Sequence, residues 1–159
     1  MPKVFLVVGN SGAGKTTLIE KLVPELKSRG YKIGTVKHAS HGFDIDKEGK
    51  DSFRHFNSGA DTVLLVGPSK IAMIKNEKCE NLELFIDKYF VDSDIVIVEG
   101  FKKENLPQIH IFRSSINDVP KEHNNLIALV TDMDIKFKCP VFKLEDISNL
   151  ADLIEKYYE

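Results

Sequence analysis

The amino-acid sequence predicts an α/β fold: a three-layer sandwich around a mostly parallel sheet, with an antiparallel hairpin as an extension. Two continuous apolar runs, Lys3–Val8 (KVFLVV) and Asp94–Gly100 (DIVIVEG), are short and rich in β-branched residues. Such runs are typical of strands covered on both faces, as in parallel sheets. Strand and helix patterns also mostly alternate along the chain, which favours right-handed crossover connections.

The other elements follow from local patterns in chain order. Helical patterns are found over four segments: Lys15–Arg29, Asp51–Asn57, Leu82–Phe90 and Ile147–Tyr157. Further strands are predicted over six segments: Lys32–Lys37, Thr62–Val66, Ile71–Ile74, Gln108–Phe112, Leu126–Val130 and Val141–Lys143. Gly30 and Gly59 stand where C-terminal helix caps belong, and Asp51 or Ser52 can cap the N-terminus of the second helix.

The middle of the chain interrupts the alternation of strands and helices. In TVLLVGPSKIAMI, two strand patterns are joined by a turn at residues 67–70, which predicts an antiparallel hairpin. The exposed edge of such a hairpin must be covered or paired, and we expect it to pair with a second chain. The strand that begins at Gln108 is expected near a sheet edge, because Pro107 cannot donate to a ladder.

Composition bounds the class of protein. A chain of 159 residues is long enough to bury a core without disulfides, and we expect one domain over residues 1–159. The net charge of −2 gives no electrostatic case for nucleic acid or an acidic membrane surface. Cys79 and Cys139 form no C-x-x-C pair, and no apolar run has the length of a membrane span or a signal peptide. These features predict a reduced, cytoplasmic protein that binds neither nucleic acid nor membrane.

The segment after the first strand fits the phosphate-binding pattern G-x-x-x-x-G-K-[ST] and predicts a P-loop NTPase fold. Its glycines allow a tight turn in which successive N–H groups point at phosphate oxygens, and the next helix adds its positive N-terminal end. A lysine reaches the terminal phosphates, and a threonine hydroxyl can ligate Mg²⁺. The predicted nucleotide contacts are Gly9, Asn10, Ser11, Gly12, Ala13, Gly14, Lys15, Thr16 and Thr17.

A carboxylate at the end of a neighbouring strand is expected to complete the Mg²⁺ shell or to position water. Ligands of open α/β sheets bind beyond the carboxyl ends of the strands. Five residues of strand span roughly 16 Å, so Asp94 and Glu99 lie at opposite ends of their strand. Glu99 is therefore the predicted metal and catalytic carboxylate beside Lys15 and Thr16, and Asp94 is interpreted as a strand-entry residue.

The base of the nucleotide is less visible in the sequence. A guanine-reading N-K-x-D motif is absent, and VTDMD is the nearest equivalent. Thr131 and Asp132 follow an apolar strand there, and Asp132 or Asp134 could accept from the N1 and N2 edge of guanine. An exposed Asp after a strand is also a common turn residue.

The three arginines of the chain do not cluster, and none stands out as an arginine finger, which favours slow hydrolysis.

The polar segment KHASHGFDIDKEGKDS follows the second predicted strand on the nucleotide side of the sheet. Lys37 and His38 are expected to face the nucleotide or a bound substrate, although a solvated strand end is the alternative. Asp46 is slightly favoured over Asp44 as a member of the Mg²⁺ shell. A separate metal site at His38 and its neighbouring histidine is weakly supported, because stable sites need three or four convergent ligands.

Three blocks read together give a family resemblance: Gly9–Thr17, Thr35–Ala60 and Val98–Lys102. With these blocks in order, the sequence resembles the molybdopterin-guanine dinucleotide biosynthesis adaptor family, MobB, over essentially the whole chain. The resemblance implies a GTP- and Mg²⁺-binding protein with weak GTPase activity. It also implies that the protein assists a separate molybdenum cofactor guanylyltransferase in attaching GMP to the molybdopterin cofactor, and that it forms a homodimer by extending sheets across two chains.

Two other functions are compatible with the glycine-rich segment. A small-molecule kinase would use it to phosphorylate a bound acceptor, but would need a catalytic base and usually an arginine-rich lid. A metallochaperone GTPase would deliver a metal through His38, His41 and perhaps His55, although their spacing does not force convergence. A preference for ATP over GTP would favour the kinase over the adaptor.

Overall fold

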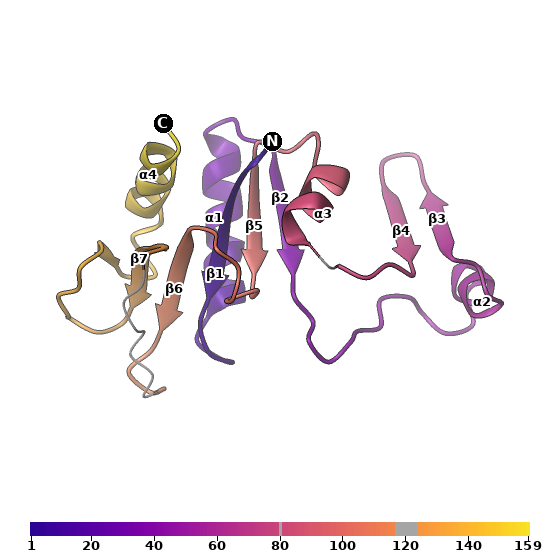
Figure 1. Ribbon diagram of the computed structural model, residues 1–159, viewed down its shortest axis with the longest axis horizontal. Helices are drawn as coiled ribbons and strands as arrows, with labels where there is room; N and C mark the ends of the chain where they lie inside the picture. The colour runs from indigo at the N-terminus through magenta and orange to yellow at the C-terminus, as the bar shows by residue number, and fades with distance from the viewer. Residues whose placement is uncertain (80, 117–123) are drawn as a thin grey trace. The chain divides into compact units, whose positions relative to one another are not determined.

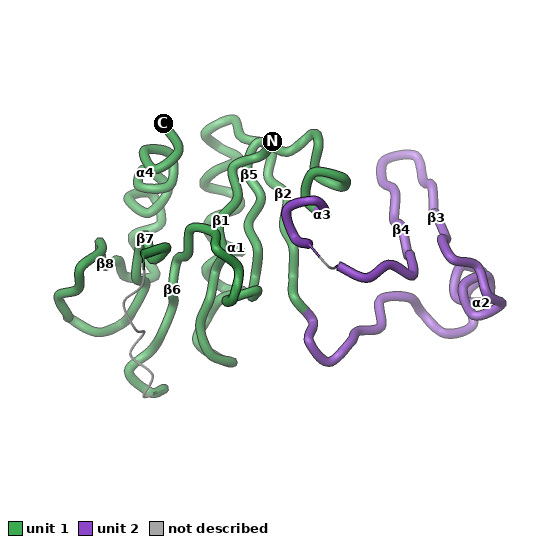
Figure 2. The backbone as a smooth tube through the Cα atoms, viewed as in Figure 1, with its two compact units in different colours: residues 1–38, 86–159 green, residues 39–85 purple. Residues whose placement is uncertain are grey.

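The computed structural model describes residues 1–79, 81–116 and 124–159 of the chain. These residues form two compact units, shown in different colours in Figure 2. Unit 1 comprises Met1–His38 and Ile86–Glu159, and unit 2 comprises Ala39–Phe85. The expectation that residues 1–159 act as one nucleotide-binding domain stays a prediction.

Unit 1 is built on a six-stranded sheet in the order β2-β5-β1-β6-β7-β8, and every pair of neighbours in it is parallel. Its strands are seen side by side in Figure 1. They are β1 (Lys3–Val8), β2 (Ile33–Lys37), β5 (Ile95–Glu99), β6 (Gln108–Phe112), β7 (Leu126–Thr131) and β8 (Val141–Phe142). The predicted α/β class with a mostly parallel sheet is confirmed.

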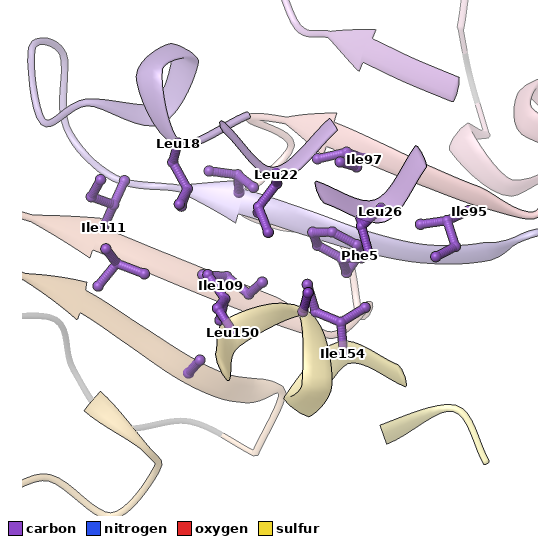
Figure 3. Packing of buried hydrophobic residues seen from close by; sticks show 14 of the residues in the cluster. Phe5, Leu18, Leu22, Leu26, Ile95, Ile97, Ile109, Ile111, Leu150 and Ile154 are labelled. Carbon is purple, nitrogen blue, oxygen red and sulfur yellow. The ribbon is translucent and has the colours of Figure 1, made fainter. Parts of the chain in front are cut away.

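Helices α1 (Lys15–Ser28) and α4 (Ile147–Tyr157) pack together against one face of this sheet. Apolar side chains recur every four residues along α1, so one stripe of the helix faces the sheet. Figure 3 shows how this stripe meets the strands and α4. The fully buried members of the cluster include Phe5, Leu18, Leu22, Leu26, Ile97, Ile109, Leu150 and Ile154.

A charged cluster joins the exposed sides of the same two helices. The guanidinium of Arg29 donates to Glu25 on α1 and to Asp152 and Glu155 on α4, at 2.6 to 2.8 Å. These carboxylates raise the pKa of Arg29 far above its ordinary value. Because three acceptors converge on one cation that is 18% exposed, the cluster ties α4 to α1 more firmly than an isolated surface pair would.

Strand register brings the carboxyl ends of β1, β2 and β5 to one edge of the sheet. Val7 of β1 pairs with Glu99 of β5, and Glu99 pairs in turn with Lys37 of β2. Because the strands are parallel, their carboxyl ends all lie at this edge, where the segment after β1 also begins. Asp94 lies at the opposite end of β5, where its carboxylate accepts from the N–H of Lys32 at 2.7 Å. Its interpretation as a strand-entry residue is confirmed.

Unit 2 contains helix α2 (Asp51–Asn57) and a separate two-stranded antiparallel sheet. The predicted hairpin is confirmed as β3 (Thr62–Val66) and β4 (Ile71–Lys75). Large apolar side chains on it are exposed: Leu64, Leu65, Val66, Ile71 and Met73. Helix α3 (Leu82–Tyr89) runs across the boundary between the two units.

Two local predictions were wrong. The strand at Gln108 is not at an edge, because β6 lies between β1 and β7. Pro107 stands just before β6, where its carbonyl oxygen accepts from the backbone N–H of Leu6. The pairing of β6 with β1 at this point therefore needs no N–H from Pro107. Helix α2 begins at Asp51 with Lys50 as its N-cap, and neither Asp51 nor Ser52 caps it. The acidic Asp51 instead lies in the first turn, where it complements the helix dipole.

Gly30 and Gly59 each adopt a positive φ directly after the C-cap residues Arg29 and Ser58, where a glycine ends a helix, as predicted. The remaining helix and strand boundaries agree with the predicted ones to within one residue. None of the helices in the described part of the chain combines the length and apolarity needed to cross a bilayer.

Candidate functional site

The glycine-rich segment connects the buried strand β1 to the first residue of α1. Gly9 and Gly14 both adopt positive φ, and a Cβ on Gly9 would lie 2.2 Å from the carbonyl oxygen of Ile111 on β6. Only glycine therefore fits where the chain leaves the sheet. Within the described residues, the first turn of α1 has no acidic residue and no side-chain cap, so its amides are available to an anion.

Lys15 and Thr16 open α1 and have different partners. The Lys15 ammonium donates to the carbonyl oxygens of Gly9 and Asn10 at 3.0 and 2.9 Å. The Thr16 hydroxyl lies 3.4 and 3.3 Å from the two carboxylate oxygens of Glu99. A hydroxyl beside a carboxylate is the oxygen ligand set that Mg²⁺ prefers, so these two residues fit the predicted metal site.

One cavity of about 370 Å³ collects most of the predicted phosphate and metal contacts. It is lined by Ser11, Gly12, Gly14, Lys15, Thr16, Thr17, Lys37 and Glu99. The Lys37 ammonium lies 3.8 Å from a Glu99 carboxylate oxygen, and its side chain is 68% exposed. Two cations, a carboxylate and a hydroxyl thus converge from three elements, an arrangement that can hold a polyphosphate with a divalent cation.

His38 is held at the end of β2 rather than extended over the loop. Its imidazole stacks on the ring of Phe101 with centroids 4.2 Å apart, and the backbone N–H of His38 donates to the Glu99 carbonyl at 2.9 Å. Gly100 has no room for a side chain, because a Cβ there would come within 2.9 Å of the His38 Cβ. Phe101 adopts a φ of 53°, a strained value for an aromatic residue. The stack therefore anchors the segment that carries Glu99.

Thr131 and Asp132 end β7 two strands away from the loop. The Thr131 side chain is 3% exposed, and its hydroxyl accepts from the N–H of Met133, so it forms a local turn. The Asp132 carboxylate accepts from the backbone N–H and the hydroxyl of Ser114 at 2.8 and 2.9 Å. These hydrogen bonds lower the pKa of Asp132 below its ordinary value. Asp132 is thus an ionised, exposed acceptor beyond the strand end.

Arg113 is the residue of this edge that the sequence analysis did not single out. It follows β6, and its Nε donates to the carbonyl oxygen of Ala13 inside the glycine-rich loop at 3.2 Å. A terminal amino group also lies 3.2 Å from the position that a Cβ on Gly14 would take. The three arginines are far apart in the sequence, and only the order β1-β6 puts this one beside the loop. Its place directly after a predicted strand was the available signal.

From Ala39 onward, the residues of the long polar segment belong to unit 2. One Asp46 carboxylate oxygen accepts from the N–H of Lys47 at 2.8 Å; the other is buried and has no hydrogen-bond partner among the described residues. The role of Asp46 in the Mg²⁺ shell stays a prediction. Over residues 1–79, 81–116 and 124–159, no group of three or more His, Cys, Asp or Glu side chains could hold a metal. His41 and His55 also lie in unit 2.

A parallel sheet, a glycine-rich loop after its central strand and a helix beginning at Lys15 define a P-loop-like α/β protein. The family model described as molybdopterin guanine dinucleotide synthesis protein B (MobB) matches residues 4–132. The chain therefore belongs to the MobB family.

Relatives and solved structures agree with this assignment. The chain is 34% identical to the molybdopterin-guanine dinucleotide biosynthesis adapter protein of Haemophilus influenzae, over 95% of this chain and 86% of the relative. It is 33% identical to the protein of that name from Escherichia coli, over 94% of this chain and 89% of the relative. A crystal structure of molybdopterin-guanine biosynthesis protein B superposes with a TM-score of 0.75 at 29% identity, covering 97% of both chains.

Proposed function

We propose that this protein is a GTP-binding adaptor in molybdopterin-guanine dinucleotide biosynthesis. The relatives that share most of its length carry adapter names for this process. The chain keeps the glycine-rich loop, Lys15, Thr16 and Glu99 in one cavity, as a nucleotide with Mg²⁺ requires. The proposed ligand is therefore GTP with Mg²⁺, and the proposed partner is the guanylyltransferase that acts on the molybdopterin cofactor.

The observation that carries this proposal is the approach of the Thr16 hydroxyl to the Glu99 carboxylate, at 3.3 to 3.4 Å. In the proposed complex, the loop amides and Lys15 bind phosphate oxygens, and Thr16 and Glu99 hold the cation. Mg²⁺ supplies neutralisation of charge on the phosphates when it is bound. Glu99 is 14% exposed, so its carboxylate is held in a partly desolvated place where its attraction for a cation is strengthened.

The same cavity supports slow hydrolysis. Among the described residues that line it there is no glutamine to orient water and no arginine to stabilise charge on the transferred phosphoryl group. Among the residues that line the cavity, Lys15, the backbone amides and the cation would then stabilise the charge, with Glu99 as the group that can position water. Slow turnover suits an adaptor or carrier better than a metabolic kinase.

A homodimer through unit 2 is part of the proposal. A two-stranded sheet alone is marginally stable in water, and β3 and β4 each leave an unpaired edge. Val66 and Ile71, which pair across the two strands, are 71% and 66% exposed. Pairing with the hairpin of a second chain would satisfy the backbone groups of these edges and cover the apolar side chains.

Calorimetry with GTP, ATP and GMP, with and without Mg²⁺, tests the nucleotide assignment. We expect GTP to bind more tightly than ATP and Lys15→Ala to abolish GTP binding. Glu99→Gln should remove most of the increase in GTP affinity that Mg²⁺ confers. Glu104→Gln is the matched control, because Glu104 is an exposed carboxylate in the turn that follows β5. Tighter binding of ATP would overturn the adaptor assignment and favour the kinase.

The adaptor role is tested by adding the protein to a guanylylation assay with the guanylyltransferase of the same organism. Lys37 is exposed at the cavity mouth and is proposed to face the nucleotide or the pterin-bearing substrate. Lys37→Ala should therefore lower GTP affinity or the stimulation of guanylylation. Unchanged values of both would remove Lys37 from the site, and absence of stimulation by the unmodified protein would refute the adaptor role.

A further inference from the structure

A second, smaller cavity lies beyond the ends of β6, β7 and β8, separate from the cavity at the glycine-rich loop. Its volume of about 100 Å³ is too small for a whole nucleotide. The walls hold apolar side chains and five polar ones: Ile111, Phe112, Val130 and Leu144, and Arg113, Thr131, Asp132, Lys143 and Glu145. A cleft with an apolar floor and a few placed polar groups is the usual form of a site for part of a small ligand.

The polar groups of this cavity are held in place by other residues of the same edge. Ser114 fixes the Asp132 carboxylate through its N–H and its hydroxyl, which uses two of about four acceptor positions of that group. The Lys143 ammonium donates to Asp134 at 2.6 Å and to the Asp132 carbonyl at 3.3 Å. An ammonium group has three N–H bonds, so one remains for a ligand. The cavity thus presents an anionic acceptor and a cationic donor side by side.

Arg113 joins this cavity to the glycine-rich loop. Its Nε is occupied by the Ala13 carbonyl, whereas its terminal amino groups have no hydrogen-bond partner in the described parts of the chain. The guanidinium is planar, always charged and weakly hydrated, and it stacks readily on aromatic rings. Arg113 thus contacts the glycine-rich loop and also lines the second cavity.

We infer that the cavity at the ends of β6, β7 and β8 takes the guanine base of the nucleotide, with Lys143 and Arg113 as specificity and stacking residues. The N1–H and N2–H groups of guanine are donors that match the Asp132 carboxylate, and O6 is an acceptor that matches Lys143. Adenine presents a donor at position 6, which would face the Lys143 ammonium, and an acceptor at N1, which would face the Asp132 carboxylate. Neither pair of groups can form a hydrogen bond. Arg113 contacts the face of either base, because stacking does not depend on which donors and acceptors the edge of the base presents.

This inference rests on the proposed function, since the loop must hold the phosphates for the base to reach the cavity. Inorganic tripolyphosphate with Mg²⁺ is therefore the probe of the loop alone, and GTP and ATP are the probes of loop and base together. Binding of each to the full chain is measured by calorimetry.

Lys143→Met tests the guanine-reading role. Loss of one hydrogen bond from a charged donor should weaken GTP binding about tenfold. The affinities of the variant for ATP and tripolyphosphate should stay within about twofold of those of the unmodified chain, a change too small for the loss of a hydrogen bond. Lys136→Met is the matched control, because Lys136 is an exposed lysine of the same connection between β7 and β8. Equal losses for GTP and ATP, or no loss for GTP, would overturn the assignment of Lys143.

Arg113→Lys tests stacking, because it keeps the charge and removes the planar group. GTP and ATP should both bind about tenfold more weakly, while tripolyphosphate is unaffected. An equal loss for tripolyphosphate would show that Arg113 only holds the loop through Ala13, and would overturn its role at the base. If the unmodified chain binds neither GTP nor tripolyphosphate, the proposed function fails and this inference with it. If it binds tripolyphosphate but does not distinguish GTP from ATP, the inference alone fails.

Discussion

Replacement of Gly9 by alanine tests whether the close contact of β1 and β6 dictates glycine at the start of the loop. Gly9 adopts a φ of 152°, and its added Cβ would lie 2.2 Å from the Ile111 carbonyl oxygen. That oxygen belongs to the backbone of a central strand, so it cannot swing away as a side chain would. Gly12 is the matched control: its φ is 77°, but a Cβ there would meet nothing within 4 Å.

The two substitutions should differ in cost because only one of them creates an overlap. Relief of the overlap at Gly9 would separate two packed strands by roughly 1 Å, and overpacking of this kind costs about 1–3 kcal/mol. Strain at the unfavourable φ adds a further amount on the order of 1–3 kcal/mol. Gly9→Ala should thus lower the free energy of unfolding by roughly 2–6 kcal/mol. Gly12→Ala should lower it by only about 1–2 kcal/mol, from backbone strain alone.

Urea denaturation followed by far-ultraviolet circular dichroism, without nucleotide, measures both changes as shifts of the midpoint at constant slope. A loss of up to about 6 kcal/mol is a large part of the stability of an ordinary domain, so Gly9→Ala should unfold at markedly lower urea. The reasoning is refuted if Gly9→Ala is no less stable than Gly12→Ala. A changed slope for either variant would point to an altered unfolded or native state, and the midpoints could then not be compared.

The remaining predictions concern the hairpin and the carboxylate at the end of β7. We expect a dimer by light scattering at micromolar concentration, and Ile71→Lys should convert it to a monomer. Leu84→Lys should leave the dimer intact, although it alters a similarly exposed apolar side chain on α3. A monomeric unmodified chain would contradict this prediction. The pKa of Asp132, lowered from 3.8 by the N–H and the hydroxyl of Ser114, should rise in Ser114→Ala, as measured by carboxyl-resolved NMR titration. Because the folded pKa is lowered, the stability contributed by Asp132 is present above pH 3.8 and is lost as the pH falls through the folded pKa. An unchanged pKa would mean that the backbone N–H alone sets it.

Local patterns in the sequence were sufficient for the elements and for one half of the site. The buried strands read as continuous apolar runs, and the loop follows the first of them, so the residues from Gly9 to Thr16 could be assigned to one place without a fold. Glu99 could be assigned to the same edge as the loop, because the direction of a strand decides at which end each of its residues lies. These are short-range properties, in which spacing along the chain determines spacing in the molecule.

The order of the strands was not available from the sequence. Nothing local indicates that β6 lies beside β1, and the proline before it suggested an edge strand instead. Arg113 reaches Ala13 only through that neighbourhood, although 100 positions separate the two residues in the chain. Lys143 and Asp132 meet for the same reason, across the ends of β7 and β8. The sequence by itself therefore determined the glycine-rich loop and the strand-end carboxylate. Only the tertiary structure decided which side chains line the second cavity, because side-by-side packing of parallel strands brings together residues from distant parts of the chain.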